Sequence, residues 1–473
     1  MKLALVSGDG LPVSGLLTIF RNVIEAELGS EELELPVVAD LGYSWRPDKE
    51  HFFPQGRPDS GYPAWMSVSD AVPVDLERAE LMRQLTRVRA GVARADALDE
   101  AERAELRDAI EALAGPYEEY FTRWLDDHDV DWVCAVNMTL SDAVPVTLGL
   151  HRAAAKRWAD GRPGGVLFWD HDLFGSCAIF EDGVRLYPEE PNEFTPVPGS
   201  HPCHRWAVVS PALAKEVSGY PTSLTASILP NVLPVVESGR LQDRHTEFLA
   251  QRDLDRDRPL LLVPVRMFRV KGVEISVSLL AEAKKICESR GTPAPYLVVF
   301  GSLDEDPPYA REVLALAGEI GVLKDIAFLD GVPLASHLDA AGQWRLDEVD
   351  LLRLCRSGPG AVLFTPNTAD VESVGLGPAL AAIAGVPCAV TDFTCFEDFY
   401  GSDSGCVVVK GYQGNEGIPE AARALVDLMD RNAAADPPVR EGLDRDREYV
   451  LRSFDPEPWR AQFRSMTLDA TPR

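Results

Sequence analysis

No apolar run in the sequence approaches the roughly 20 residues that a membrane-spanning helix needs. The opening stretch, MKLALVSGDG, is too short an apolar segment for a secretory signal peptide and is more typical of a first strand. None of the eight cysteines stands in a Cys-x-x-Cys pair, so the sequence indicates neither a zinc site nor a disulfide framework. We therefore expect a reduced, cytoplasmic protein that is not an integral membrane protein.

Basic residues are few compared with acidic ones, with 46 Lys and Arg against 75 Asp and Glu and a formal net charge of −29. Nucleic-acid binding needs a basic face that neutralises phosphates, so this class of function is excluded. An anionic bilayer would also repel an acidic surface. A soluble partner molecule is therefore favoured over a membrane lipid.

Short apolar runs alternate with helical patterns along most of the 473 residues, which is typical of α/β domains with parallel sheets. The length suggests two or three such domains. The charged, Ala- and Leu-rich segment 75–127 predicts an inserted helical hairpin with a break at Gly115-Pro116. The main strands are expected at residues 2–6, 130–137, 165–169, 206–210, 227–229, 260–265, 296–301, 361–364 and 388–390.

The most informative stretch runs from Ala361 to Asp392. An apolar strand and a polar loop lead to Glu372, which stands just before the turn Gly375-Leu376-Gly377. A small-residue helix, 378–384, follows the turn and leads into a second strand. Such a turn presents unpaired backbone N–H groups at a helix N-terminus, where phosphate binds readily, and glycine allows close approach. Glu372 is an acceptor suited to sugar hydroxyls.

A second basic element lies about a hundred residues upstream, where the strand 260–265 ends and Arg266 and Lys271 follow. Open α/β sheets bind ligands at the carboxyl ends of their strands. An arginine fork together with a lysine charge suits a diphosphate. A solvated basic loop is the alternative interpretation.

Polar residues also follow strands in the N-terminal half. A glycine-rich loop from Ser7 to Gly15 connects the first strand to a helix, and its spacing differs from the Gly-x-Gly-x-x-Gly of a dinucleotide site. Asn137 ends one strand, and His171 and Asp172 follow the next. These positions face the ligand edge of the sheet. The alternative for His171 is a histidine satisfied by its neighbouring carboxylate.

Together these motifs resemble family 4 of the retaining glycosyltransferases. Arg266-x4-Lys271-Gly272 is similar to that family's Arg-x4-Lys-Gly motif, and the segment from Glu372 to Pro387 is similar to its Glu-x7-Glu segment. The strands at 296–301 and 325–331 resemble those that flank the nucleotide, and Leu229-Pro-Asn231 resembles the opening of the family's second domain. The likeness covers the C-terminal half well and the N-terminal half loosely.

The resemblance implies an α/β protein of the GT-B fold, with two Rossmann-like domains facing a central cleft and a helical insertion in the N-terminal one. Residues 1–230 would form the acceptor-side domain with the insertion at about 75–127, and residues 231–440 the nucleotide-sugar domain. Residues 441–473 would form a helix that crosses back to the first domain. The implied reaction is retaining transfer of a sugar from a UDP- or GDP-type nucleotide sugar to a soluble small-molecule acceptor. A homodimer is allowed.

The family's site residues carry over to matching positions of this chain. Arg266 and Lys271 would stabilise the leaving diphosphate, Glu372 would hold the donor sugar, and His171 would line its reacting face. The remaining candidates surround the nucleotide, the acceptor or the cleft, namely Gly15, Gly301, Leu329, Ser373, Val374, Gly375, Leu376, Gly377, Asn137 and Asp172.

One position departs from the family pattern. The second Glu of the motif, which in the family binds the nucleotide's ribose, is Leu380 here, and leucine accepts no hydrogen bond. A coupling enzyme with a pseudo-sugar or other non-standard donor, or a non-catalytic nucleotide-sugar-binding protein, therefore stays open.

No metal and no cofactor are expected. Asp304-Glu-Asp306 has an Asp-x-Asp spacing but lies in a loop, and the fixed cations Arg266 and Lys271 already supply positive charge.

Overall fold

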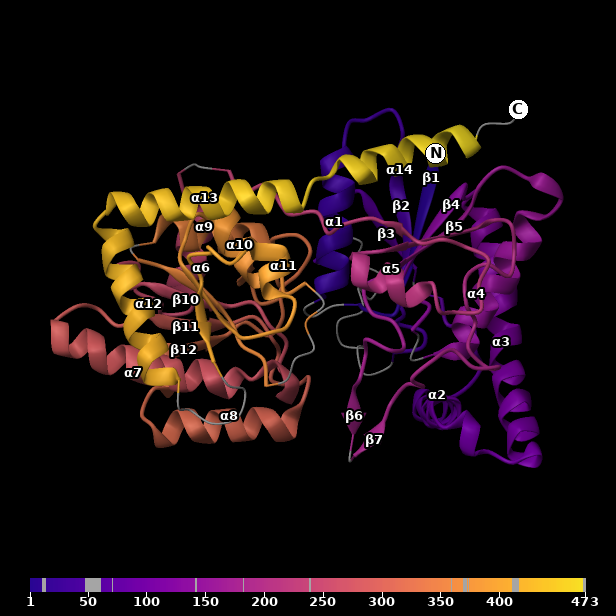
Figure 1. The fold of residues 1–473 in the computed structure, drawn as a ribbon, viewed down its shortest axis with the longest axis horizontal. Coiled ribbons are helices and arrows are strands. Elements are labelled where there is room, and N and C mark those ends of the chain that lie inside the picture. The colour runs from indigo at the N-terminus through magenta and orange to yellow at the C-terminus, as the bar shows by residue number, and fades with distance from the viewer. Residues whose placement is uncertain are drawn as a thin grey trace.

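The computed structural model describes residues 1–10, 14–46, 61–69, 71–140, 143–181, 183–237, 240–358, 360–368, 372, 374–410 and 417–470. Within these residues the chain forms two α/β domains that lie side by side (Figure 1). No helix in the described part is long and apolar enough to cross a membrane.

The N-terminal domain is built on a parallel sheet of seven strands within the described residues, in the order β3-β2-β1-β4-β5-β8-β9. All five residues of β4 are buried, as expected of a parallel strand covered on both faces. The strands are β1 (Lys2–Ser7), β2 (Glu34–Asp40), β3 (Met66–Val68), β4 (Trp132–Val136), β5 (Gly165–Asp170), β8 (His204–Val208) and β9 (Ser227–Ile228). The helices α1 (Gly15–Glu27), α4 (Val144–Arg157) and α5 (Pro211–Val217) belong to this domain.

The second domain has a parallel sheet with six described strands, in the order β12-β11-β10-β15-β16-β17. These are β10 (Leu260–Val263), β11 (Tyr296–Val299), β12 (Ile326–Phe328), β15 (Val362–Thr365), β16 (Cys388–Thr391) and β17 (Val407–Val409). Its helices are α6 (Asp243–Gln251), α7 (Val273–Arg290), α8 (Pro307–Glu319), α9 (Glu348–Ser357), α10 (Gly377–Ala384), α11 (Phe396–Tyr400) and α12 (Ile418–Ala433). Two short hairpins complete the described strands, β6 (Phe180–Glu181) with β7 (Val184–Arg185) and β13 (His337–Leu338) with β14 (Trp344–Arg345).

Both sheets reverse their strand order next to the first strand of the domain, between β1 and β4 and between β10 and β15. Loops on the two sides of such a switch point diverge and leave a crevice at the carboxyl ends of the strands. The order of the strands therefore places two crevices, one in each domain.

The helical insertion consists of α2 (Arg78–Ala93) and α3 (Glu100–Asp127), and Asp99 caps α3 with a capping box to Glu102. The predicted break at Gly115-Pro116 is wrong, because α3 continues through both residues. Proline removes one backbone donor, but α3 packs so closely on α4 that a Cβ at Gly149 would lie 2.8 Å from the Cβ of Tyr117. Tertiary packing of the buried Tyr117 outweighs the local cost of the proline.

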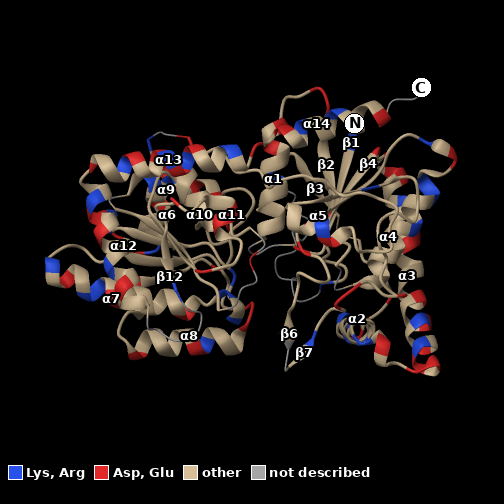
Figure 2. Ribbon diagram, viewed as in Figure 1, with Lys and Arg blue, Asp and Glu red and all other residues tan. Residues whose placement is uncertain are grey.

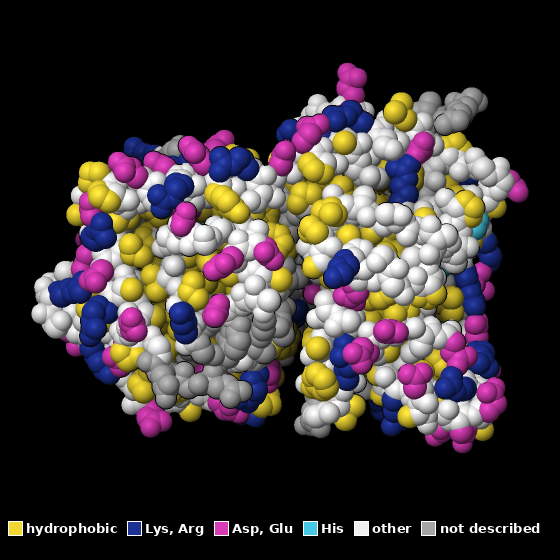
Figure 3. Space-filling view, in the orientation of Figure 1, with side chains coloured by type: hydrophobic (Ala, Val, Ile, Leu, Met, Phe, Trp, Pro, Cys, Tyr) yellow, Lys and Arg dark blue, Asp and Glu magenta, His cyan; other side chains and the backbone are white. Residues whose placement is uncertain are grey.

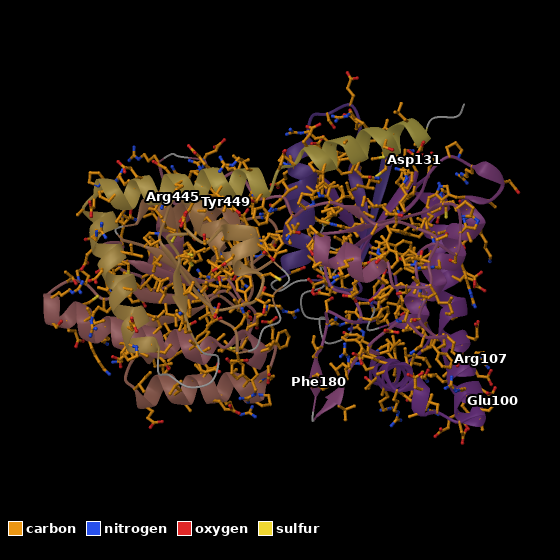
Figure 4. The ribbon with its side chains drawn as sticks, viewed as in Figure 1. Glu100, Arg107, Asp131, Phe180, Arg445 and Tyr449 are labelled. Carbon is orange, nitrogen blue, oxygen red and sulfur yellow. The ribbon has the colours of Figure 1, made fainter. Side chains whose placement is uncertain are left out.

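Charged side chains cover the outer faces of the long helices, with acidic and basic residues interspersed along α3, α7, α12 and α13 (Pro437–Ser453) (Figure 2). The labelled Glu100 and Arg107 of α3 lie far from the other domain (Figure 4). The hairpin β6–β7 extends beside the junction between the domains, and the exposed Phe180 lies on β6, at the end of the hairpin away from its turn (Figure 4).

The C-terminal helices connect the two domains. Helix α13 lies along the second domain, and α14 (Glu457–Ala470) crosses to the first (Figure 1). Trp459 of α14 is buried against Trp169 of β5, with ring centroids 4.5 Å apart, and its indole N–H donates to the Pro230 carbonyl at 2.9 Å. Trp132 of β4 donates in turn to the carbonyl of Met466. These contacts fix α14 on the N-terminal sheet.

Replacing Trp459 by alanine is expected to destabilise the N-terminal domain by about 3–5 kcal/mol, because it removes a buried aromatic ring and leaves a cavity. Urea denaturation followed by circular dichroism measures the effect. The control is Leu468→Ala on the same helix, where a side chain 75% exposed should change stability by less than about 0.5 kcal/mol. Equal denaturation midpoints for the two variants would contradict this account of how α14 is held.

Candidate functional site

A cavity of about 470 Å³ lies where the carboxyl edges of the two sheets face each other. The space-filling view shows the furrow along which the domains meet (Figure 3). Residues after β1, β4 and β5 form one wall, and residues after β10 and β15 form the other. The predicted site residues that line it are Gly15, Asn137, His171, Asp172, Arg266, Lys271, Glu372, Val374, Gly375, Leu376 and Gly377.

Arg266 follows β10 and is held by a buried carboxylate. Its Nε donates to Glu305 at 2.7 Å, and Glu305 also accepts from the backbone N–H groups of Met267 at 2.9 Å and Ser302 at 3.2 Å. The Glu305 side chain is only 3% exposed, whereas that of Arg266 is 24% exposed and stacks on Phe268. Glu305 thus fixes the guanidinium while its remaining donors stay at the cavity wall.

Two predicted residues lie behind this wall. A Cβ at Gly301 would lie 2.4 Å from the backbone nitrogen of Met267, so glycine is required for the Arg266 loop to lie against β11. Gly301 therefore supports Arg266 from behind and is not among the residues that line the cavity. Leu329 is buried in the core, and the lining residue of that loop is Val332.

Lys271 ends the 3₁₀ turn Arg269–Lys271 and hydrogen-bonds to Glu372 across the loop after β15. This pair places one cation and one carboxylate next to the turn that begins α10. Both side chains are partly exposed to the cavity.

The turn before α10 depends on glycine at two positions. Gly375 has φ +65°, and a Cβ at Gly377 would lie 1.6 Å from Oγ1 of Thr365, so no other residue fits there without rearrangement. Among the described residues, no side chain caps the N-terminus of α10, so the backbone N–H groups of its first turn, which Pro378 lacks, lie at the cavity wall without a side-chain partner. Val374 and Leu376 complete this wall, and Ser373 lies outside the described residues.

On the opposite wall, Asn137 adopts the left-handed conformation, φ 52°, which asparagine tolerates better than most residues. Its Oδ1 accepts from the backbone N–H groups of His171 at 2.7 Å and Asp172 at 3.2 Å, and its Nδ2 donates to the Asp172 carboxylate at 2.9 Å. Asn137 therefore positions both residues. Burial raises the pKa of the Asp172 carboxyl.

His171 is 5% exposed and packs edge-on against Trp169. Burial lowers its pKa to about 3, although the charge of Asp9 acts in the opposite direction, so the imidazole is neutral at pH 7. Its Nε2 has no hydrogen-bond partner among the described residues, and its neighbour Asp172 is held by Asn137. The alternative of a histidine satisfied by the adjacent carboxylate is therefore wrong.

Gly15 begins α1, and the space where its side chain would be is open to the cavity. Ser14 caps this helix by accepting from the Leu17 N–H and donates to Asp9. Asp9 also lies 3.6 Å from Arg266, and this ion pair joins the two walls.

Four buried polar atoms in the cavity wall accept or donate no hydrogen bond within the described part of the chain. They are Nε2 of His171, Oδ1 of Asn231, Oε1 of Glu348 and Oγ1 of Thr365. Buried polar groups are usually paired, so this cluster points to a ligand that supplies the partners.

Two side chains of the segment Asp304-Glu-Asp306 make hydrogen bonds within the protein. Glu305 holds Arg266, and Asp306 caps α8 by accepting from the Tyr309 N–H. Among the described residues, no three His, Cys, Asp or Glu side chains lie close enough together to hold a metal ion.

Reasoning from the sequence did not identify Glu305, Glu348 or Asp9 as site residues. Asp9 follows β1 at the switch point, a position that could have marked it. Glu305 lies in a loop before α8 and Glu348 is the first residue of α9, both outside any motif. Only the packing of the domain brings Glu305 against Arg266 and Glu348 to the cavity.

No protein-family model matches the sequence, and no curated protein matches it either. Solved structures do match its fold. A glycosyltransferase from Rickettsia africae superposes with a TM-score of 0.57 at 11% identity, covering 100% of this chain and 99% of that one.

Anabaena HepE in complex with UDP-glucose gives a TM-score of 0.55 at 11% identity, with 100% of both chains covered. Sucrose-phosphate synthase from Thermosynechococcus elongatus gives 0.54 at 14% identity, with 98% of both chains covered. This chain has the GT-B fold of these enzymes, and the predicted architecture of two Rossmann-like domains facing a cleft is confirmed.

Proposed function

We propose that the protein is a glycosyltransferase that moves a sugar from a UDP- or GDP-type nucleotide sugar to a soluble small-molecule acceptor with retention of configuration. The observation that carries the proposal is one cavity that unites Arg266, Lys271 and the uncapped start of α10 on one wall with His171 and Asn137 on the other. The positive charge of the first wall thus faces the neutral imidazole of His171, the amide of Asn137 and the carboxylate of Asp9. HepE, which shares the fold, binds UDP-glucose in its complex.

In this reaction, negative charge develops on the leaving diphosphate, and the site must stabilise it. Fixed donors that need no reorganisation stabilise such charge most strongly. Arg266 meets this condition because Glu305 already holds its Nε, and the dipole of α10 adds positive potential at the same wall. Lys271 contributes a second charge from the neighbouring turn.

The donor sugar would lie between this wall and His171. Glu372 can accept from sugar hydroxyls on the phosphate side, and the neutral imidazole of His171 offers Nε2 on the other. A neutral His171 avoids placing a positive charge beside the oxocarbenium-like carbon of the transferring sugar. Retention itself is inferred from the resemblance of the Arg266-x4-Lys271-Gly272 and Glu372 motifs to the retaining family.

The acceptor would enter from the N-terminal domain, where Trp45, Tyr187 and Gly15 line the cavity. The formal charge of −29 favours a soluble acceptor over an anionic membrane surface. A coupling enzyme with a pseudo-sugar donor is the second candidate, and Leu380 is the observation that favours it.

Incubation with a panel of UDP-, GDP- and ADP-sugars and soluble acceptors tests the proposal, with release of the nucleoside diphosphate as the readout. Turnover of at least one ordinary nucleotide sugar is expected. Binding of nucleoside diphosphates without turnover of any donor would favour the non-catalytic alternative.

Lys271→Ala is expected to lower kcat/KM by about 10²–10³-fold, the loss typical of one preorganised donor to a developing anion. Arg266→Ala should lower it at least as much. Arg266→Ala also leaves Glu305 buried without its cation, so its melting temperature should fall, whereas that of Lys271→Ala should not. Steady-state kinetics and thermal unfolding measure the two effects.

The matched control for both variants is Arg269→Ala in the same loop. Arg269 is 60% exposed, pairs with Glu312 of α8 and does not line the cavity. Its kinetics should stay close to those of the unmodified protein. Near-normal kcat in both Lys271→Ala and Arg266→Ala would contradict the diphosphate assignment.

Turnover is expected to need no divalent cation, because Arg266, Lys271 and the start of α10 together supply the positive field that a metal ion would otherwise provide. After exhaustive chelation with EDTA, kcat should stay within about twofold of its value in added magnesium. Loss of turnover on chelation, with recovery on adding magnesium or manganese, would refute this expectation.

A further inference from the structure

Glu348, the first residue of α9, is an acidic residue of the cavity wall that belongs to no motif. It lines the cavity together with Phe300, Val332 and Leu380, and its side chain is 14% exposed. Its buried Oε1 accepts no hydrogen bond from any described residue. Because buried acceptors are rarely left unpaired, this oxygen points to a hydrogen-bond donor on a ligand.

The surroundings of Glu348 keep its carboxylate available. Arg21 of α1 lies 3.8 Å away, beyond hydrogen-bond distance, and donates instead to the Leu334 carbonyl at 3.1 Å and to Asn22 at 3.0 Å. Arg21 therefore offsets part of the negative charge of Glu348 without satisfying its oxygen. Burial nevertheless raises the pKa of Glu348 to about 7.

The position of Glu348 indicates which part of a nucleotide it meets. Arg266 and Lys271 follow β10, whereas Phe300 follows β11 and Val332 follows β12, so the strand order separates the phosphate-binding groups from these apolar residues. Phe300, Val332 and Leu380 provide apolar surface for a base. A ribose connects the two, and its vicinal hydroxyls are donors that a carboxylate can accept together.

We propose that Glu348 accepts hydrogen bonds from the ribose hydroxyls of the donor nucleotide. This inference rests on the proposed function. Helix α9 packs on α10, and Leu380 of α10 lines the same cavity as Glu348. The acceptor that Leu380 cannot provide thus comes from the neighbouring helix, and the protein selects ribonucleotides through α9.

Calorimetric titration with UDP, GDP and their 2′,3′-dideoxy analogues tests the inference. The unmodified protein should bind the ribonucleotide about ten- to a hundredfold more tightly than its dideoxy analogue, as expected for hydrogen bonds to a charged group. In Glu348→Gln and Glu348→Leu this ratio should fall to within about threefold, with the affinity for the dideoxy analogue unchanged.

The matched control is Glu25→Gln. Glu25 of α1 lies 3.9 Å from the same Arg21 but does not line the cavity. This variant therefore removes a negative charge beside Arg21 without changing a residue that could contact the ribose. It should keep the full preference for the ribonucleotide. Thermal unfolding of each variant separates a loss of fold from a loss of contact.

A reciprocal exchange provides a second measurement. Leu380→Glu combined with Glu348→Leu returns the carboxylate to α10 across the same cavity, and it should restore at least part of the preference for ribonucleotides that Glu348→Leu loses. A purely structural role for Glu348 would give no such restoration.

The preference should also depend on pH. Above pH 7 Glu348 is a carboxylate and accepts most strongly, so the ratio of ribonucleotide to dideoxy affinity should be larger at pH 8 than at pH 6. The charged groups that face Glu348 are Arg21 from α1 and Asp347, the N-cap residue of α9, and they act in opposite directions on its pKa. Titration of the phosphates cancels in this ratio, and Glu348→Gln should remove its pH dependence.

Four results would overturn the inference. An unchanged ratio in both Glu348 variants, or no ribose preference in the unmodified protein, would overturn it and leave the proposed function standing. Equal losses for the ribonucleotide and the dideoxy analogue would assign Glu348 a structural role. Failure of the unmodified protein to bind any nucleoside diphosphate would overturn the inference and the proposed function together.

Discussion

The rest of the structure depends on the topological constraint that parallel strands impose. Each parallel pair needs a crossover helix, so every loop that leaves a strand at its carboxyl end gathers at one edge of the sheet. Where the strand order reverses, at β1/β4 and at β10/β15, those loops separate. Two such edges face each other here, and the cavity follows from this arrangement together with α14, which ties the second domain back to the first.

The two cations of the cavity, Arg266 and Lys271, form ion pairs that differ in how far their carboxylates are buried. Glu305 is almost fully buried and accepts three hydrogen bonds, two from the Arg266 loop and one from the backbone N–H of Ser302. Asp9 is 3.6 Å from Arg266 and more exposed, and Glu372 pairs with Lys271 at the cavity surface. In the proposed reaction, the diphosphate of the donor would replace these more exposed contacts without disturbing Glu305.

The two walls of the cavity also differ in charge. The C-terminal wall presents positive charge and helix N–H groups, whereas the N-terminal wall presents a neutral histidine braced by Asn137. A positively charged His171 would be unfavourable both in its buried position and beside an electron-poor sugar carbon. Burial therefore selects the protonation state that the proposed reaction requires.

Much of this was predictable from local sequence. Continuous apolar runs predicted the buried strands, with ends within a few residues of those observed, because a parallel strand covered on both faces tolerates little else. The sequence placed Arg266 and Lys271 at a strand end, and Glu372 and the two glycines at the turn before a helix. The structure brings these residues together. The prediction failed at Gly115-Pro116, since the cost of a proline is local whereas the packing of α3 on α4 is not.

Only the tertiary structure decided which residues support the site and which complete it. Glu305 and Glu348 stand in no motif, and Gly301 acts through the 2.4 Å approach that its missing Cβ allows, so none of these roles is visible along the chain. The sequence alone determined the apolar pattern, the excess of acid and the cations at strand ends, because these depend on residue type and spacing. The roles of Glu305, Glu348 and Asn137 depend instead on distances between segments far apart in the chain, and those are set only when the two sheets and α14 pack together.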